Sequence, residues 1–68
     1  MDWSSIEGNW PRYKASAHAR WREITLRELG LIAGRRERLT GQVQAVYGLS
    51  SEEARTQVRQ WLDEQVGA

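Results

Sequence analysis

The sequence contains no cysteine and no phenylalanine, and only one histidine and one proline among its 68 residues. The lack of cysteine excludes a disulfide and a thiolate metal site, and it favours a reducing compartment. A chain this short buries roughly 60% of the surface that its unfolded form exposes. We therefore expect residues 1–68 to fold as one domain whose small core is stable unaided or with a partner subunit.

Long apolar runs are also absent. No stretch of 18 apolar residues occurs, so the sequence predicts no membrane-spanning helix. Its first residues include Asp2 and Glu7, where a secretion signal needs a basic start and then an apolar stretch. These features favour a cytoplasmic protein.

Neither sign of charge predominates, because the chain has ten Lys and Arg residues and nine Asp and Glu residues, giving a net charge of +1. Residues 1–47 hold eight basic and five acidic residues, whereas residues 48–68 hold two basic and four acidic residues. The imbalance is typical of a solvated surface with a slight dipole. The charge alone therefore does not require a nucleic-acid partner.

Large aromatic side chains are frequent, with four tryptophans and two tyrosines. Since the mean hydropathy is low, at −0.72, these rings must supply much of the core, each burying roughly 150–250 Å². Trp10, Tyr13, Ala17 and Trp21 recur at helical spacing and share one face of a helix predicted over residues 10–22. We expect the rings on this face to lie in the core rather than to bind a ligand.

Capping residues mark where the first two main helices begin. Asn9 is a favourable N-cap whose side-chain oxygen would accept a backbone N–H, and Pro11 suits the first turn. Thr25 and Glu28 match a capping box. The short helix after Thr25 is expected to end near Gly34 or to continue with a kink.

Similar signals bound the last two helices. A helix is predicted over residues 35–47, with Gly48 as a left-handed C-cap, and Ser50 and Glu53 form a second capping box. Gly41 lies inside the first of these helices, where glycine costs ~1 kcal/mol relative to alanine. That cost predicts that another helix packs closely against the Gly41 backbone.

No segment alternates polar and apolar residues with a period of two, so the predicted fold class is all-α. We expect a compact bundle of about four short helices, arranged as two helical hairpins packed orthogonally. Trp3 either covers the core or remains partly exposed. The predicted core residues are Trp10, Tyr13, Trp21, Ile32, Leu39, Val43, Val46, Val58, Trp61 and Leu62.

An ordered set of Trp, Gly and Tyr positions over residues 3–62 resembles the CsbD-like family of small bacterial stress-response proteins. The matching positions are Gly8-Asn9-Trp10, Tyr13-Lys14, Trp21, Ile32-Ala33-Gly34-Arg35-Arg36, Leu39, Gly41, Gln44, Tyr47-Gly48, Ala54, Val58 and Trp61. The resemblance implies a single CsbD-like domain with a four-helix fold similar to that of sterile-alpha-motif domains. It also implies abundance during general stress, and it brings no catalytic residue, cofactor or ligand.

Two features depart from the family pattern. Family members often have glycine where this chain has Ala15 and Arg22, and an acidic run where it has Leu26-Arg27-Glu28. The two glycine replacements favour helix formation. Because Leu26-Arg27-Glu28 replaces the acidic run, we expect a surface that is less acidic than in related proteins.

Residues that could carry chemistry are few and scattered. His18 has alanine on both sides and no cysteine to act with, and a single histidine is a poor metal site. The pairs Glu52-Glu53 and Asp63-Glu64 point in different directions, since adjacent residues on a helix lie about 100° apart. The glycines form no phosphate-binding loop. We expect no enzymatic activity, no cofactor and no metal.

Two binding functions remain as alternatives to an accessory stress-response domain. One is self-association through an exposed aromatic ring, either Trp3 or Tyr47. The other is a nucleic-acid-binding module with an arginine-rich face, although nearby acidic residues dilute it. Its candidate contact residues are Arg20, Arg22, Arg27, Arg35, Arg36 and Arg38.

Overall fold

The computed structural model describes residues 3–66, and within that range every regular element is an α-helix. The all-α prediction is confirmed: four helices have seven or more residues, and a fifth, which begins at Trp3, has six residues. The helices are α1 (Trp3–Gly8), α2 (Trp10–Arg20), α3 (Leu26–Ile32), α4 (Arg36–Tyr47) and α5 (Ser51–Val66).

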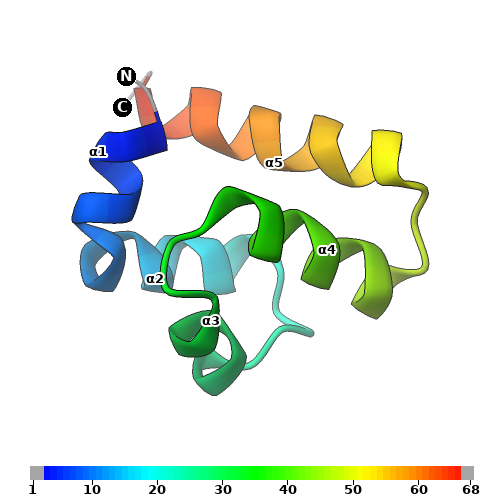
Figure 1. Cartoon of the computed structure of the whole chain (residues 1–68), viewed down its shortest axis with the longest axis horizontal. Helices are drawn as coiled ribbons and strands as arrows, with labels where there is room; N and C mark the ends of the chain where they lie inside the picture. The colour runs from blue at the N-terminus through cyan, green and yellow to red at the C-terminus, as the bar shows by residue number, and fades with distance from the viewer. Residues whose placement is uncertain (1–2, 67–68) are drawn as a thin grey trace.

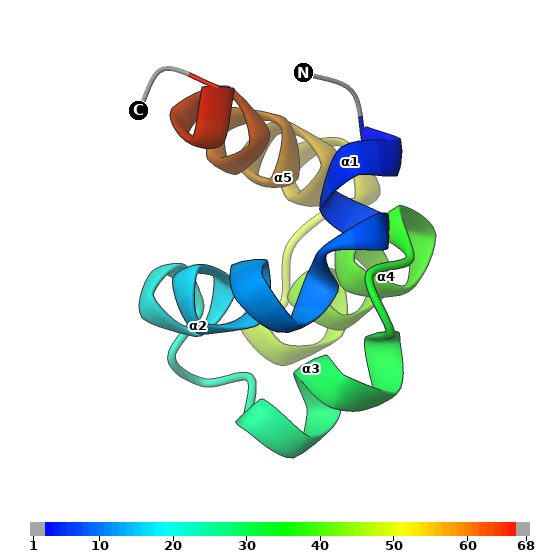
Figure 2. The same cartoon turned by 90° about the vertical axis from the view of Figure 1, so that its left-hand side faces the viewer.

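The helices pack as two pairs that share one core. α4 and α5 run antiparallel and are joined by a short turn (Figure 1). α2 packs against α3, and α3 lies on the far side of the molecule from α5 (Figure 2). α1 links the pairs, because its Trp3 ring contacts Trp61 of α5 with centroids 5.9 Å apart.

The core draws on all five helices and on the connection between α2 and α3. Tyr13 and Leu62, both predicted in the core, are partly buried and pack against it. Ile24, in the connection, is completely buried although no periodicity marked it. The buried residues are Ile6, Trp10, Ala17, Trp21, Ile24, Leu29, Ile32, Leu39, Val43, Ala54, Val58 and Trp61.

Val46 differs from the prediction that placed it in the core. It lies in the last turn of α4 and is 36% exposed. Leu49, in the turn that follows, is partly buried and packs against the core in its place. The apolar stripe of α4 therefore ends at Val43, one turn earlier than its spacing indicated.

The boundary between α1 and α2 also differs from the prediction. Asn9 precedes α2, but its side chain makes no cap bond to that helix. Its Nδ2 donates instead to the carbonyl oxygen of Ser5 at 2.9 Å. Because α1 ends immediately before Asn9, the side chain satisfies a carbonyl at the end of α1, where helical partners run out. α2 ends at Arg20, two residues earlier than expected.

Gly34, rather than Gly41, is where two segments approach closely. α3 ends at Ile32, and Ala33 and Gly34 follow with left-handed φ values of 56° and 78°. A Cβ on Gly34 would lie 3.0 Å from the Glu7 Cα and 3.1 Å from the Trp10 Cβ. A Cβ on Gly41 would meet nothing within 4 Å, so the close contact predicted there is wrong.

The capping box predicted at Ser50 is complete, whereas the one at Thr25 forms only in half, because the Glu28 carboxylate accepts from the Thr25 hydroxyl and not from its backbone N–H. Thr25 Oγ1 accepts from the Glu28 N–H at 3.1 Å at the start of α3. At the start of α5, the Ser50 N–H donates to Glu53 Oε1 and the Glu53 N–H donates to Ser50 Oγ, each at 3.1 Å. Gly48, with φ of 64°, ends α4 as predicted.

The carboxylate of Glu53 gives the fold an acid-sensitive element. Hydrogen bonds from the backbone and side chain of Ser50 hold the pKa of Glu53 below its ordinary value of 4.5. A carboxylate with a lowered folded-state pKa stabilises the fold above its unfolded pKa, and this stabilisation is lost as the pH falls through the folded value.

Glu53→Gln retains an acceptor oxygen but removes the charge, so we expect it to lower the stability at neutral pH. Urea denaturation of both proteins at neutral pH and at about pH 3 measures the effect. The difference between them should shrink at the acidic pH. A difference that stays the same at both pH values would contradict this account of Glu53.

Candidate functional site

The six arginines predicted as a nucleic-acid face come from several elements. Arg20 lies at the end of α2, Arg22 in the following connection and Arg27 on α3. Arg35, Arg36 and Arg38 lie at the start of α4, and all six residues are exposed.

Two of these arginines donate hydrogen bonds to neighbouring groups. Arg20 donates to Gln60 Oε1 at 3.3 Å and pairs with Glu64 at 3.7 Å. Arg38 donates to the carbonyl oxygen of Leu31 at 3.4 Å. Both contacts tie a surface helix to its neighbour. They therefore give these two arginines a structural role.

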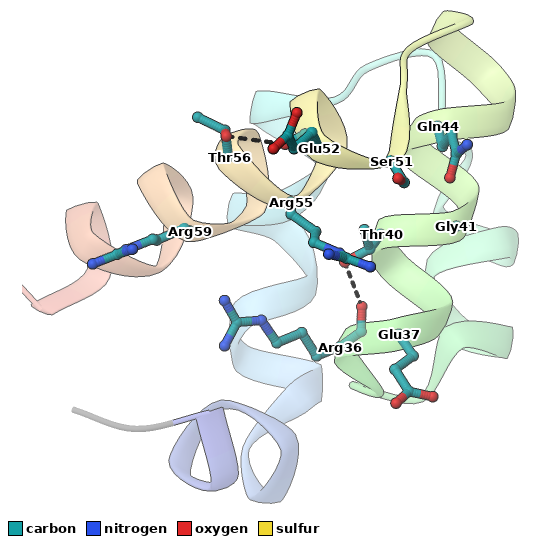
Figure 3. Close-up of a pocket in the computed structure, with 10 residues that line it drawn as sticks. All are labelled: Arg36, Glu37, Thr40, Gly41, Gln44, Ser51, Glu52, Arg55, Thr56 and Arg59. Carbon is teal, nitrogen blue, oxygen red and sulfur yellow. Dashed lines mark hydrogen bonds between the residues drawn. The ribbon is translucent and has the colours of Figure 1, made fainter.

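An open polar groove runs between α4 and α5 and has a volume of about 630 Å³. The two helices lie side by side. Residues about four apart share one surface of a helix, so such residues from each helix line the two edges of the groove. Only Arg36 of the six predicted arginines lines it, together with Arg55 and Arg59 of α5 (Figure 3). Its lining residues are Arg36, Glu37, Thr40, Gly41, Gln44, Ser51, Glu52, Arg55, Thr56 and Arg59.

Three guanidinium groups dominate the chemistry of the groove. Arg55 and Arg59 make no ion pair with any residue between 3 and 66. Arg36 lies over the ring of Trp3, with its Cζ 5.6 Å from the ring centroid, which is a cation–π contact. This contact fixes the direction of one arginine, while the other two extend from α5 with no ion-pair partner in the part of the chain that the structure describes.

Some of the other polar side chains of the groove already make hydrogen bonds within the chain. Thr40 donates to the carbonyl oxygen of Arg36 at 2.8 Å, and Thr56 donates to that of Glu52 at 3.0 Å. Figure 3 shows Arg55 lying between Glu52 of α5 and Glu37 of α4, whereas Arg36 and Arg59 extend away from the two glutamates. With three arginines and two glutamates, the groove keeps a positive balance, so it suits a negatively charged ligand.

Sequence reasoning missed Arg55 and Arg59 because they lie in the segment with the acidic balance. Their spacing of four residues, on a helix whose stripe of Ala54 and Val58 is buried, was the available signal. The short turn between the last two helices was the other signal, because it makes them antiparallel neighbours. Together these signals place Arg36 across the groove from Arg55 and Arg59.

Other titratable side chains lie outside this groove or stabilise the helices that form it. His18 is half-buried on α2. Glu53 belongs to the capping box of α5, and Glu64 pairs with Arg20. Between residues 3 and 66, no group of three or more His, Asp or Glu side chains is placed to hold a metal ion.

The aromatic side chains converge on Trp61. Its ring centroid lies 5.8 Å from that of Trp21 and 6.4 Å from those of Trp10 and Tyr13. Its Nε1 donates to Ser16 Oγ at 3.2 Å. This ring therefore connects α5 to α2 at the centre of the molecule.

The two rings considered for self-association are both engaged within the chain. Trp3 is half-buried, and its Nε1 donates to the carbonyl oxygen of Gly34 at 2.7 Å. Tyr47 is 38% exposed, and its hydroxyl accepts from the Glu23 N–H at 3.1 Å. Each ring thus has a role in holding the fold together.

Comparison with known proteins identifies relatives in several bacteria. The chain is 35% identical to a UPF0337 protein of Pectobacterium atrosepticum, over 93% of this chain and 91% of the relative. It is 38% identical to one of Rhodopseudomonas palustris, over 91% of this chain and 94% of the relative. A relative in Nitrosomonas europaea is 41% identical over 85% of this chain, which spans 62% of that protein. No family model and no solved structure matches the chain.

The fold and the groove define a small all-helical protein with a polar, arginine-lined surface. None of its helices, over the residues that the structure describes, is long and apolar enough to cross a membrane. The chain belongs to the UPF0337 family, which corresponds to the CsbD-like family that its sequence resembles.

Proposed function

We propose that the chain is a non-enzymatic protein of the bacterial stress response and acts as a small folded accessory or protective domain in the cytoplasm. The observation that carries this proposal is the convergence of four aromatic rings on Trp61. The side chains with the largest contact area are used to hold the helices together. The resemblance to the CsbD-like family supports the assignment to stress.

The placement of titratable groups supports a non-catalytic role. A general base needs a reacting group within hydrogen-bond reach. Glu53 instead bonds to Ser50 at a helix start, and Glu64 pairs with Arg20 between two helices. These carboxylates have structural partners that account for their positions.

Complementation of a deletion strain tests this proposal. In the source bacterium, the amount of the protein should rise on entry into stationary phase or salt stress, and deletion should lower survival. The wild-type chain and His18→Gln should restore survival equally, because the proposal assigns no proton transfer to the only histidine. Trp61→Ala, which truncates a buried ring and should be strongly destabilised, should not restore survival.

Two results would overturn the proposal. Survival that does not change on deletion under any stress would remove the stress role. Loss of complementation by a folded His18→Gln would indicate catalysis or a ligand at that residue.

A further inference from the structure

We propose that the groove between α4 and α5 binds the phosphodiester backbone of nucleic acid through Arg36, Arg55 and Arg59. This inference goes beyond the stress-response role and does not depend on it. It also replaces the arginine-rich face suggested by the sequence, because only Arg36 is common to the two sets.

The positive charge of the groove comes from both of its helices. Arg36 approaches from α4 and the other two arginines from α5, so guanidinium groups line both edges of one groove (Figure 3). Guanidinium groups bind phosphate oxygens with two parallel hydrogen bonds, so arginine is preferred where phosphate is recognised. Arg55 and Arg59 have no ion-pair partner among residues 3–66 that an incoming phosphate would have to displace.

The exposure of the groove favours an extended ligand. All three arginines are exposed, and the groove is open along its length. A single small anion gains little from exposed charges in water. A chain of phosphates can contact several arginines at once and gains from the release of counterions. The groove therefore suits a polymer of phosphates better than a free phosphate ion.

The groove is held in place by packed side chains. Arg36 rests on the ring of Trp3, whose Nε1 is bonded to Gly34 and whose ring packs on Trp61. The two helices of the groove are fixed to each other by the buried side chains of Leu39, Val43, Ala54 and Val58. Binding therefore requires only the long arginine side chains to become ordered, which limits its entropic cost.

Fluorescence anisotropy with a labelled DNA duplex of about 16 base pairs tests the proposal, using the full chain at low salt. Three phosphate contacts predict a slope of about −2.7 for the logarithm of the binding constant against that of salt concentration. Binding should accordingly weaken by about 40-fold between roughly 50 and 200 mM salt. Replacing all three groove arginines, as Arg36→Gln/Arg55→Gln/Arg59→Gln, should weaken low-salt binding by at least about tenfold and flatten the slope.

The matched control is Arg22→Gln/Arg27→Gln/Arg35→Gln, which removes the same charge from the face suggested by the sequence. It should retain most of the binding, and thermal melts of both variants should remain cooperative because all six side chains are exposed. Equal losses in the two variants would indicate attraction to net charge alone, and a larger loss in the control would assign binding to the other face. Either result overturns the proposal.

Two further outcomes bear on the ligand. Absence of binding to duplex and single-stranded DNA at low salt, with protein up to about 1 mM, would end the proposal. Poly-glutamate that binds as tightly as DNA would show that the groove accepts acidic protein and does not prefer phosphate. Weaker binding of poly-glutamate would support the phosphodiester assignment.

Discussion

Trp61→Ala should remove a large part of the free energy of unfolding of the protein. Truncating a buried tryptophan costs about 3–5 kcal/mol, and a domain of this size has a total stability of only roughly 3–10 kcal/mol. Trp61 is 1% exposed and contacts three other tryptophans and Tyr13. Its loss therefore leaves a cavity bordered by three helices. Thermal and urea denaturation followed by circular dichroism would measure the change.

Trp61→Phe is the matched control. It keeps an aromatic ring in the core and loses the hydrogen bond from Nε1 to Ser16. We expect a cooperative melt with a clearly smaller loss than in Trp61→Ala. A cooperative melt of Trp61→Ala within about 1 kcal/mol of the wild type would show that this ring does not organise the core. Trp21→Ala should fall in the same range as Trp61→Ala, because Trp21 is also 1% exposed.

Gly34→Ala should destabilise the fold by roughly 2–4 kcal/mol. Left-handed backbone costs a residue with a Cβ about 1–2 kcal/mol, and forcing extra atoms into a packed site costs about 1–3 kcal/mol. Gly34 incurs both costs, because its φ is 78° and a Cβ would lie 3.0 Å from the backbone of Glu7. The clashing atom is backbone, so it cannot rotate away.

Gly41→Ala is the opposite case and the control. Its Cβ would meet nothing within 4 Å, and the residue lies inside α4. Alanine is the better helix former by about 0.5–1 kcal/mol, so this variant should be more stable than the wild type. Denaturant midpoints of the two variants should shift in opposite directions. If Gly41→Ala were destabilised, that result would support the close packing at Gly41 that was predicted from the sequence.

The features that the sequence predicted well are local ones. A capping box depends on residues three apart, so Thr25 with Glu28 and Ser50 with Glu53 located two helix starts without knowledge of the fold. The left-handed cap at Gly48 is equally local. Helical spacing likewise placed Trp10 and Trp21 on one face, and both are buried.

The features that the sequence did not predict depend on how the helices meet. Gly34 and Gly41 look alike in a linear pattern, but the fold gives Gly34 a left-handed φ beside α1 and leaves Gly41 inside α4 with open space around it. Ile24 lies in a connection, where no periodicity indicates burial. The groove joins Arg36 to residues about twenty positions later, across an antiparallel helix pair. Counting charges by segment does not reveal the positive balance of the groove, because Arg55 and Arg59 lie in a segment with more acidic than basic residues.

The ring cluster around Trp61 also gives the protein a built-in optical reporter. Four rings surround that of Trp61 at fixed angles between 57° and 85°, and such chiral environments produce a strong near-ultraviolet dichroism signal. This signal disappears when tertiary packing loosens even while helices persist. The unlabelled protein can therefore reveal a loosened, still helical state during heating or acidification.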